Sequence, residues 1–185
     1  MSIFRTKWIV LKISKIKDWE FLYTIFTKEY WKILCNKKLS KKEKTLDLWY
    51  IVNFEISTKE NQSIHKIRNI KIISEFSREN KTFSILNNYL IILSILLKKT
   101  PNWLPINELF ELVESMNNEK DINDIKLILI KLKIISIFWE LNENHQNETI
   151  QKILKFINAN NIERILKLTG INEKLENILW TMIDF

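Results

Sequence analysis

The chain has 185 residues, of which 46% are hydrophobic and 28% charged, and its formal net charge is +7. These fractions are typical of a globular protein and exclude wholesale disorder, while the single cysteine, Cys35, excludes an internal disulfide and a cysteine-based zinc site. With two histidines and one glycine the chain lacks the residues for a histidine-rich metal site or a glycine-rich phosphate loop, so we expect no cofactor and no enzymatic activity.

Five segments in the first 76 residues have the alternating pattern and the β-branched and aromatic content that are typical of strands. They span residues 6–14, 21–27, 31–35, 46–56 and 64–75. Polar breaks separate them, and no helical period interrupts them. Short strands that follow one another at this spacing predict a small closed barrel of the OB-fold class.

The hydrophobic period changes after residue 77. Phe83, Leu86, Leu90, Leu93 and Leu97 recur every three or four residues, which predicts a helix with one buried face. Further helices are predicted at 106–116, 121–139, 149–159, 162–168 and 172–183, with Gly170 at a C-cap and with Lys131 and Lys133 on a surface stripe. We therefore predict an α+β protein in which an N-terminal five-stranded OB-fold barrel, residues 1–76, is followed by an all-α helical domain, residues 77–185.

The net positive charge lies in the first half of the chain. Residues 1–80 contain 17 Lys and Arg against 9 Asp and Glu, a net charge of +8, whereas residues 81–185 contain 12 against 13, a net charge of −1. A cationic half joined to a neutral half indicates that the first half binds nucleic acid. The alternative is that AT-rich coding raises the lysine content along the whole chain. This does not explain the difference in net charge between the two parts.

The loop between the third and fourth predicted strands is dominated by lysine, which supplies mobile point charges for phosphates. The predicted DNA contacts are this loop and cations on neighbouring strands, namely Lys12, Lys32, Lys37, Lys38, Lys41, Lys42, Lys44 and Arg68. The alternative is a solvated loop whose lysines only keep the protein soluble. Aromatic residues such as Trp8 and Phe54 are expected to fill the barrel rather than to stack on bases.

The apolar runs are too short to cross a membrane. The most apolar one, at residues 89–97, is far below the roughly 20 residues that span a bilayer. Basic residues interrupt the apolar N-terminus, so no secretory signal is predicted. We expect a cytoplasmic protein without membrane contact.

Short identities along the chain resemble the RecO family of bacterial recombination mediators. TKWIVLK at residues 6–12 is similar to the family's first strand, and Asp18-Trp-Glu20 with LYTIFTKEYWKI at 22–33 is similar to its acidic pair, second strand and turn. Residues 46–56 and 64–76 match the next two strands in pattern and length, and the proline-containing break before Glu108-Leu-Phe110 fits the helical half. The resemblance covers nearly the whole chain and is strongest over residues 6–76. Many members carry a four-cysteine zinc site, which this chain replaces by a short loop at 141–148.

The resemblance implies a non-enzymatic DNA-binding protein of recombinational repair. Members bind single- and double-stranded DNA through the OB barrel and anneal complementary strands. They also bind the RecR protein and the C-terminal tail of single-stranded DNA-binding protein, and they assist the loading of RecA on gapped DNA. Helices rich in leucine and isoleucine often leave an apolar groove that an acidic tail could enter, with a lysine at its rim such as Lys98, Lys99, Lys131 or Lys133. The alternative is that these helices only pack on one another.

Two other functions stay open. Residues 162–179 have the pattern of a helix–turn–helix transcription regulator, although the second helix carries Glu173 and Glu176 against Lys174 alone. A structural adaptor that does not bind DNA is the other alternative. Gel shifts with single-stranded, duplex and palindromic DNA distinguish the three.

Glycine is almost absent from the chain. A globular protein of this length contains roughly 13 glycines, whereas this one has one glycine and seven tryptophans. We hypothesise that some tryptophans stand at UGA codons that the source organism decodes as glycine. Trp31, Trp139 and Trp8 are the candidates, because the resembling family has glycine at such positions, whereas Trp49 and Trp180 are expected to be true core aromatics.

Overall fold

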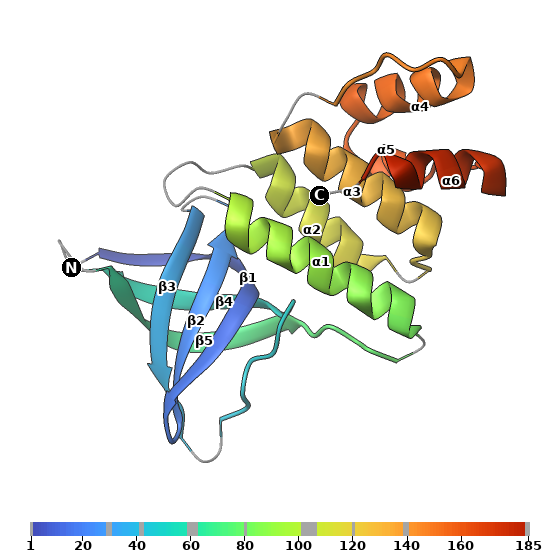
Figure 1. Ribbon diagram of the computed structural model, residues 1–185. Coiled ribbons are helices and arrows are strands. Elements are labelled where there is room, and N and C mark those ends of the chain that lie inside the picture. The colour runs from blue at the N-terminus through green and yellow to red at the C-terminus, as the bar shows by residue number, and fades with distance from the viewer. Residues whose placement is uncertain are drawn as a thin grey trace. The chain divides into compact units, whose positions relative to one another are not determined.

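The computed structural model describes residues 2–28, 31–40, 43–58, 63–79, 81–100, 107–119, 121–138 and 141–183. The chain forms two compact units, one of Met1–Glu79 with Leu93–Phe110 and one of Asn80–Ile92 with Glu111–Phe185. The first unit contains a β-barrel, and the second is helical (Figure 1).

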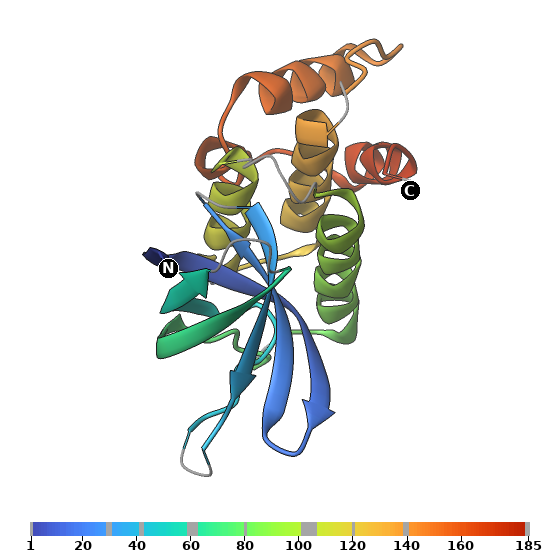
Figure 2. The same cartoon turned by 90° about the vertical axis from the view of Figure 1, so that its left-hand side faces the viewer.

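The barrel consists of β1 (Ser2–Lys17), β2 (Glu20–Thr27), β3 (Trp31–Lys38), β4 (Ile51–Thr58) and β5 (Ile64–Ser74). The strands close in the order β1-β2-β3-β5-β4, and all neighbours are antiparallel except β3 and β5. Figure 2 shows the blue and green strands wrapping around one interior. This is the strand order of an OB fold, so the predicted α+β architecture, an OB barrel followed by helices, is confirmed.

A single long strand, β1, closes the barrel because it pairs with two partners. Its first half pairs with β4 and its second half with β2. The register shifts between Val10 and Lys12, where a bulge bends the strand from one partner to the other. The sequence predicted only residues 6–14 of this strand.

Alternate strand residues fill the barrel interior. The indole of Trp8 stacks on Phe54 with ring centroids 4.6 Å apart and planes 18° from parallel. Tyr23, Ile25 and Cys35 join the same buried cluster. Trp8 and Phe54 therefore fill the core, as the pattern predicted, and are not available for stacking on bases.

Strand β4 begins five residues later than the sequence predicted. Residues 47–50 form a turn in which the Tyr50 N–H donates to the Asp47 carbonyl at 3.3 Å. Leu46, just before this turn, is 4% exposed and belongs to the barrel core. Its apolar character therefore reflects a core contact made from a loop, and not an extension of the strand.

The helices are α1 (Phe83–Lys99), α2 (Asn107–Asn118), α3 (Asp124–Phe138), α4 (Glu148–Ala159), α5 (Ile162–Ile165) and α6 (Glu173–Thr181). Asparagine caps the last three, because the side chains of Asn147, Asn161 and Asn172 accept hydrogen bonds from first-turn N–H groups. Gly170 is not a C-cap as predicted, since α5 already ends at its cap, Leu166. Gly170 instead supplies a positive φ of 83° in the connection to α6. No helix in the described parts of the chain is both long enough and apolar enough to span a bilayer.

The prediction of a lysine surface stripe on α3 is wrong. Lys131 and Lys133 are only 2% and 3% exposed. The Lys131 ammonium donates to Asn88 Oδ1 at 2.5 Å and lies 4.6 Å from the ring centroid of Trp180, while Lys133 donates to the Ile157 carbonyl at 3.3 Å. Burial lowers the pKa of Lys131. Leucine and isoleucine on all sides of α3 bury its central residues 127–134, including Lys131 and Lys133, so neither of these two lysines can stand at the rim of an open groove.

Candidate nucleic-acid interface

The outer surface of β1, β2, β3 and β5 carries three rows of residues that run across the strands. The register aligns Lys12 with Thr24, Leu34 and Ile64 in the first row. The second row is Ser14, Leu22, Asn36 and Lys66, and the third is Lys17, Glu20 and Lys38. We call this surface, defined by these eleven residues, the β2–β3 face. Outward positions on these strands alternate with core residues such as Tyr23 and Cys35.

Exposed lysines surround exposed aliphatic side chains on the β2–β3 face. Leu34 and Ile64 are 37% and 42% exposed. Lys12, Lys17, Lys38 and Lys66 are exposed around them, and Glu20 is the single carboxylate of the face. Such a surface offers cations to phosphates and apolar area to bases.

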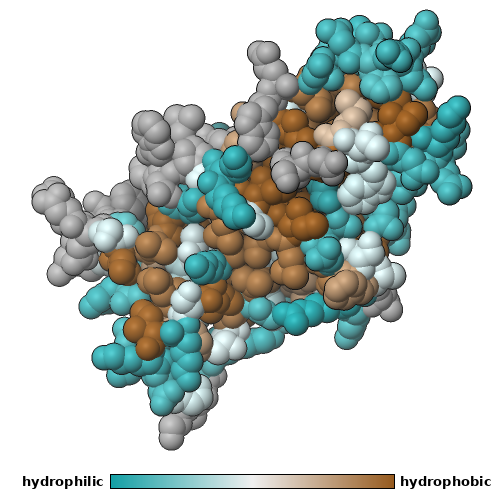
Figure 3. Space-filling model, in the orientation of Figure 1, coloured by the Kyte–Doolittle hydropathy of each residue, from teal (hydrophilic) through white to brown (hydrophobic). Residues whose placement is uncertain are grey.

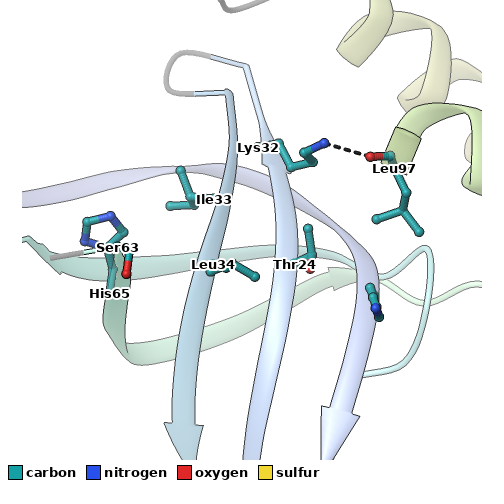
Figure 4. A pocket seen from close by; sticks show the side chains of 8 residues that line it. Thr24, Lys32, Ile33, Leu34, Ser63, His65 and Leu97 are labelled. Carbon is teal, nitrogen blue, oxygen red and sulfur yellow. Dashed lines mark hydrogen bonds between the residues drawn. The ribbon is translucent and has the colours of Figure 1, made fainter. Parts of the chain in front are cut away.

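A cavity of about 560 Å³ opens at the first row of this face. Figure 4 shows Ser63 and His65 on one side of Leu34, and Thr24 and Leu97 on the other. The complete lining is Lys12, Thr24, Lys32, Ile33, Leu34, Ser63, His65 and Leu97. All of these residues belong to the barrel unit.

Lys32 lies in the wall of this cavity with most of its hydrogen bonds already made. Its ammonium donates to the Leu97 carbonyl at 2.7 Å (Figure 4) and to the Thr100 carbonyl at 2.8 Å, at the end of α1. Burial lowers the pKa of this lysine. Because an ammonium has three N–H donors, one remains for another partner. Lys32 was predicted as a DNA contact, and here it satisfies carbonyls at a helix C-terminus.

Two lysines of the lysine-rich loop are paired with carboxylates. Lys37 lies 2.8 Å from Glu43, which also accepts a hydrogen bond from the Ser40 N–H at 2.6 Å. These two donors lower the pKa of Glu43 to about 2. Lys44 lies 2.5 Å from Glu75, a residue 31 positions further along the chain. Lys41 and Lys42, also predicted as contacts, lie outside the described residues.

A second basic surface lies on β1, β4 and β5 and includes Arg68. We call it the β4–β5 face and define it by Arg5, Lys7, Glu55, Arg68 and Lys71. The register pairs Glu55 with both Arg5 and Arg68, and Arg5 contacts the Glu55 carboxylate at 2.5 Å. Arg5 and Asn69 lower the pKa of Glu55. Arg5, Lys7, Asn53, Phe54, Glu55, Asn69 and Lys71 line a cavity of about 420 Å³.

The structure thus distributes the predicted DNA-contact residues over different surfaces of the barrel. Lys12 and Lys38 come together on the β2–β3 face, and Arg68 lies on the β4–β5 face. Lys17 and Lys66 belong to the β2–β3 face but were not predicted as contacts. Lys66 joins the β2–β3 face only through the parallel pairing of β3 with β5, so no local pattern in the sequence could have placed it there.

The helical unit exposes an apolar surface on the first half of α1. Phe83, Leu90 and Ile91 are 85%, 53% and 37% exposed. Their spacing of seven and eight residues places them on one side of a helix. Figure 3 shows hydrophobic side chains gathered over α1. This exposed apolar surface suits a protein partner better than a nucleic acid.

No protein-family model matches the chain, and no curated protein matches it significantly. Within the described ranges, no three His, Cys, Asp or Glu side chains gather as a metal site. The geometry and charge of the barrel are therefore the features that bear on its function.

Proposed function

We propose that the protein is a DNA-binding recombination mediator that binds single-stranded DNA across the β2–β3 face and anneals complementary strands. The observation that carries this proposal is the arrangement of Lys12, Lys38 and Lys66 around exposed Leu34 and Ile64 on an OB barrel. Lysines bind phosphates of any sequence, and aliphatic side chains contact any base. The binding is therefore expected to be independent of sequence.

Annealing requires that two polyanions approach each other. The β4–β5 face gives the barrel a second cationic surface, with Arg5, Arg68 and Lys71 around one carboxylate. A strand on each face would have part of its charge neutralised by the protein, which reduces the repulsion between strands. No covalent step is needed for this role.

The protein partners and pathway in the proposal come from the resemblance to the RecO family. They are RecR, the tail of single-stranded DNA-binding protein and assistance to RecA. The exposed apolar surface of α1, with Phe83, Leu90 and Ile91, is the candidate surface for such a tail. Of the four lysines expected at a groove rim, Lys98 and Lys99 are exposed.

The transcription-regulator alternative is less well supported. Its first helix would be α5, which is only four residues long, and its second would be α6, whose first turn carries Glu173 and Glu176. Carboxylates at that position would repel the phosphates that a recognition helix must approach. The adaptor alternative is distinguished by the absence of DNA binding.

The test is fluorescence anisotropy with a labelled single strand, followed by annealing of its complement. The Lys12/Lys38/Lys66→Glu variant is expected to lose at least tenfold in affinity and to anneal more slowly. The control, Lys152/Lys155/Lys174→Glu, makes the same charge change on exposed positions of α4 and α6 and should bind like the wild type. An equal loss of affinity in both variants would show that the effect comes from net charge alone. It would contradict DNA binding on the β2–β3 face.

A further inference from the structure

We propose that the cavity at the first row of the β2–β3 face holds one unstacked base of the bound strand. This inference rests on the proposed function. It specifies which part of the bound strand, a base, enters the cavity. Its volume of about 560 Å³ lies within the range of pockets that bind small organic groups.

The lining suits a base better than a phosphate. Ile33, Leu34 and Leu97 provide aliphatic walls, and Thr24 and Ser63 provide hydroxyl groups. Of the two lysines, Lys32 is engaged by the carbonyls at the end of α1, which leaves Lys12 as the main cation at the margin. Aliphatic walls combined with hydroxyl groups and a lysine at the margin fit a base whose own phosphate lies outside, on Lys12.

His65 supplies a polar atom that lacks a protein partner. Its Nδ1 is buried and makes no hydrogen bond within the described part of the chain. Buried polar atoms are nearly always hydrogen-bonded, so an unpaired one in a cavity wall points to an external partner. The polar edge of a base carries both N–H groups and acceptors and can satisfy either tautomer of the imidazole.

The experiment compares two labelled strands of the same length and charge, one with thymine bases and one made entirely of abasic sites. The wild-type protein is expected to bind the thymine strand at least about fivefold more tightly. Leu34→Ala is expected to reduce this preference, whereas Ile73→Ala, at an apolar β5 residue that is 46% exposed and outside the cavity, should retain it.

The outcomes separate this inference from the proposed function. Tight, salt-sensitive binding of both strands with equal affinity would contradict the base pocket and leave the DNA-binding proposal intact. A preference that Leu34→Ala and Ile73→Ala reduce equally would also contradict it. Failure to bind either strand at low salt would overturn the proposed function itself.

A second inference comes from the backbone and does not depend on function. We infer that the native protein carries glycine at positions 19 and 49. Trp19 is the third residue of the turn at 17–20, whose ends Lys17 and Glu20 pair across β1 and β2. Trp49 is the third residue of the hydrogen-bonded turn at 47–50. Their φ angles are 62° and 64°.

Positive φ at the third residue of such a turn requires glycine or asparagine, and a bulky side chain there is an outlier. Elsewhere in the described ranges, positive φ occurs at Asn69 and Gly170, which are residue types that accept it. Tryptophan is thus found twice where the backbone strongly favours glycine or asparagine, in a chain with one glycine and seven tryptophans. UGA codons decoded as glycine would explain both facts.

The φ angles change the set of positions at which glycine is inferred. Trp49 is 2% exposed and was expected to be a true core aromatic, yet the positive φ in its turn favours glycine. Trp8 has no positive φ and stacks on Phe54, so the backbone gives no reason to infer glycine at this position. Trp31 lies in β3 without positive φ, and Trp139 lies outside the described residues.

Mass spectrometry of the protein isolated from its source tests this directly. The tryptic peptides 18–28 and 45–59 should each be lighter than the printed sequence requires, by the replacement of one indolylmethyl group with hydrogen. An indole in either peptide would overturn the inference for that position.

Recombinant variants test the backbone argument separately. Trp19→Gly and Trp19→Ala both remove a side chain that is 46% exposed, but only glycine relieves the left-handed conformation. The folded-to-unfolded ratio should be about 5- to 30-fold higher for Trp19→Gly than for Trp19→Ala. Equal stability of the two variants would contradict the inference that position 19 favours glycine.

Discussion

The ammonium of Lys37 lies 2.8 Å from the carboxylate of Glu43, and only 16% of the lysine side chain is exposed. The most lysine-rich segment of the chain therefore holds an internal ion pair at the position where the sequence suggested a free cation. Solvent screens the exposed carboxylate of this pair, so the pair contributes little to stability. Under the proposed function, a phosphate of the bound strand would compete with Glu43 for Lys37.

This relationship predicts opposite effects for its two members. Glu43→Gln removes a carboxylate that competes with DNA, so the affinity for a single strand should rise about two- to fivefold. Lys37→Gln should lower the affinity by a similar factor and should reduce the salt slope by about 0.7. Anisotropy titrations at several salt concentrations measure both. Unchanged affinity in both variants would show that the loop does not take part in binding.

Lys32 should contribute to folding more than to binding. Lys32→Met removes two charge-assisted hydrogen bonds to carbonyls at the end of α1, so the free energy of unfolding should fall by about 1–3 kcal/mol. The affinity for single-stranded DNA should fall less than in Lys12→Met. Urea denaturation and anisotropy on the same two variants measure these effects. A larger loss of affinity for Lys32→Met than for Lys12→Met would indicate that Lys32 contacts a phosphate.

The stacked pair in the barrel core predicts a large loss of stability on truncation. Phe54 is 2% exposed, and Phe54→Ala should lower the free energy of unfolding by about 3–5 kcal/mol. The control Ile73→Ala, at a side chain that is 46% exposed, should stay within about 0.5 kcal/mol of the wild type. Denaturant midpoints test the difference, and a small effect of Phe54→Ala would show that the interior is not packed as described.

Tyr23 predicts a loss of stability in alkaline solution. Burial raises the pKa of its phenol to about 12, against 10 for an unperturbed tyrosine. Between these values the unfolded chain releases a proton that the folded protein keeps, so the free energy of unfolding falls as the pH rises from 10 towards 12. Tyr23→Phe should make this decline shallower in urea denaturation at pH 9 to 12. An identical decline in the variant would contradict a buried phenol.

Cys35 should be unreactive in the folded protein. Its side chain is fully buried, and burial raises the pKa of the thiol, so very little thiolate exists at neutral pH. Iodoacetamide should therefore modify Cys35 much faster in denaturant than in buffer, as measured by intact-protein mass spectrometry. Rapid modification in buffer would mean that the barrel opens near β3.

Local patterns predicted those elements whose hydrophobic residues recur with the period of a strand or of a helix. Alternation identified all five strands, and the three-to-four-residue period identified α1 with bounds close to Phe83–Lys99. The bounds failed where a residue contributes to the core from outside a strand. Leu46 does so from a loop, and the turn at 47–50 follows it, so β4 begins only at Ile51.

The candidate site was harder to predict because it depends on pairing between distant segments. Lys44 forms an ion pair with Glu75, and Arg68 lies opposite Glu55 in the β4–β5 register, and neither partner is near in sequence. Lys131 is buried because its helix is apolar on all sides, a property that a count of lysines does not reveal. Lys66 joins Lys12 and Lys38 on one surface only through the parallel pairing of β3 with β5.

The most direct test of the account is the salt dependence of single-strand binding by the wild type and by Lys12/Lys38/Lys66→Gln. If the four lysines of the β2–β3 face each neutralise one phosphate, they should together contribute about −3 to the slope of log affinity against log salt in the wild type. Removal of three of them should make the slope shallower by about 2. The same slope in both proteins, or no binding by the wild type at low salt, would contradict the assignment of the β2–β3 face as the DNA-binding surface.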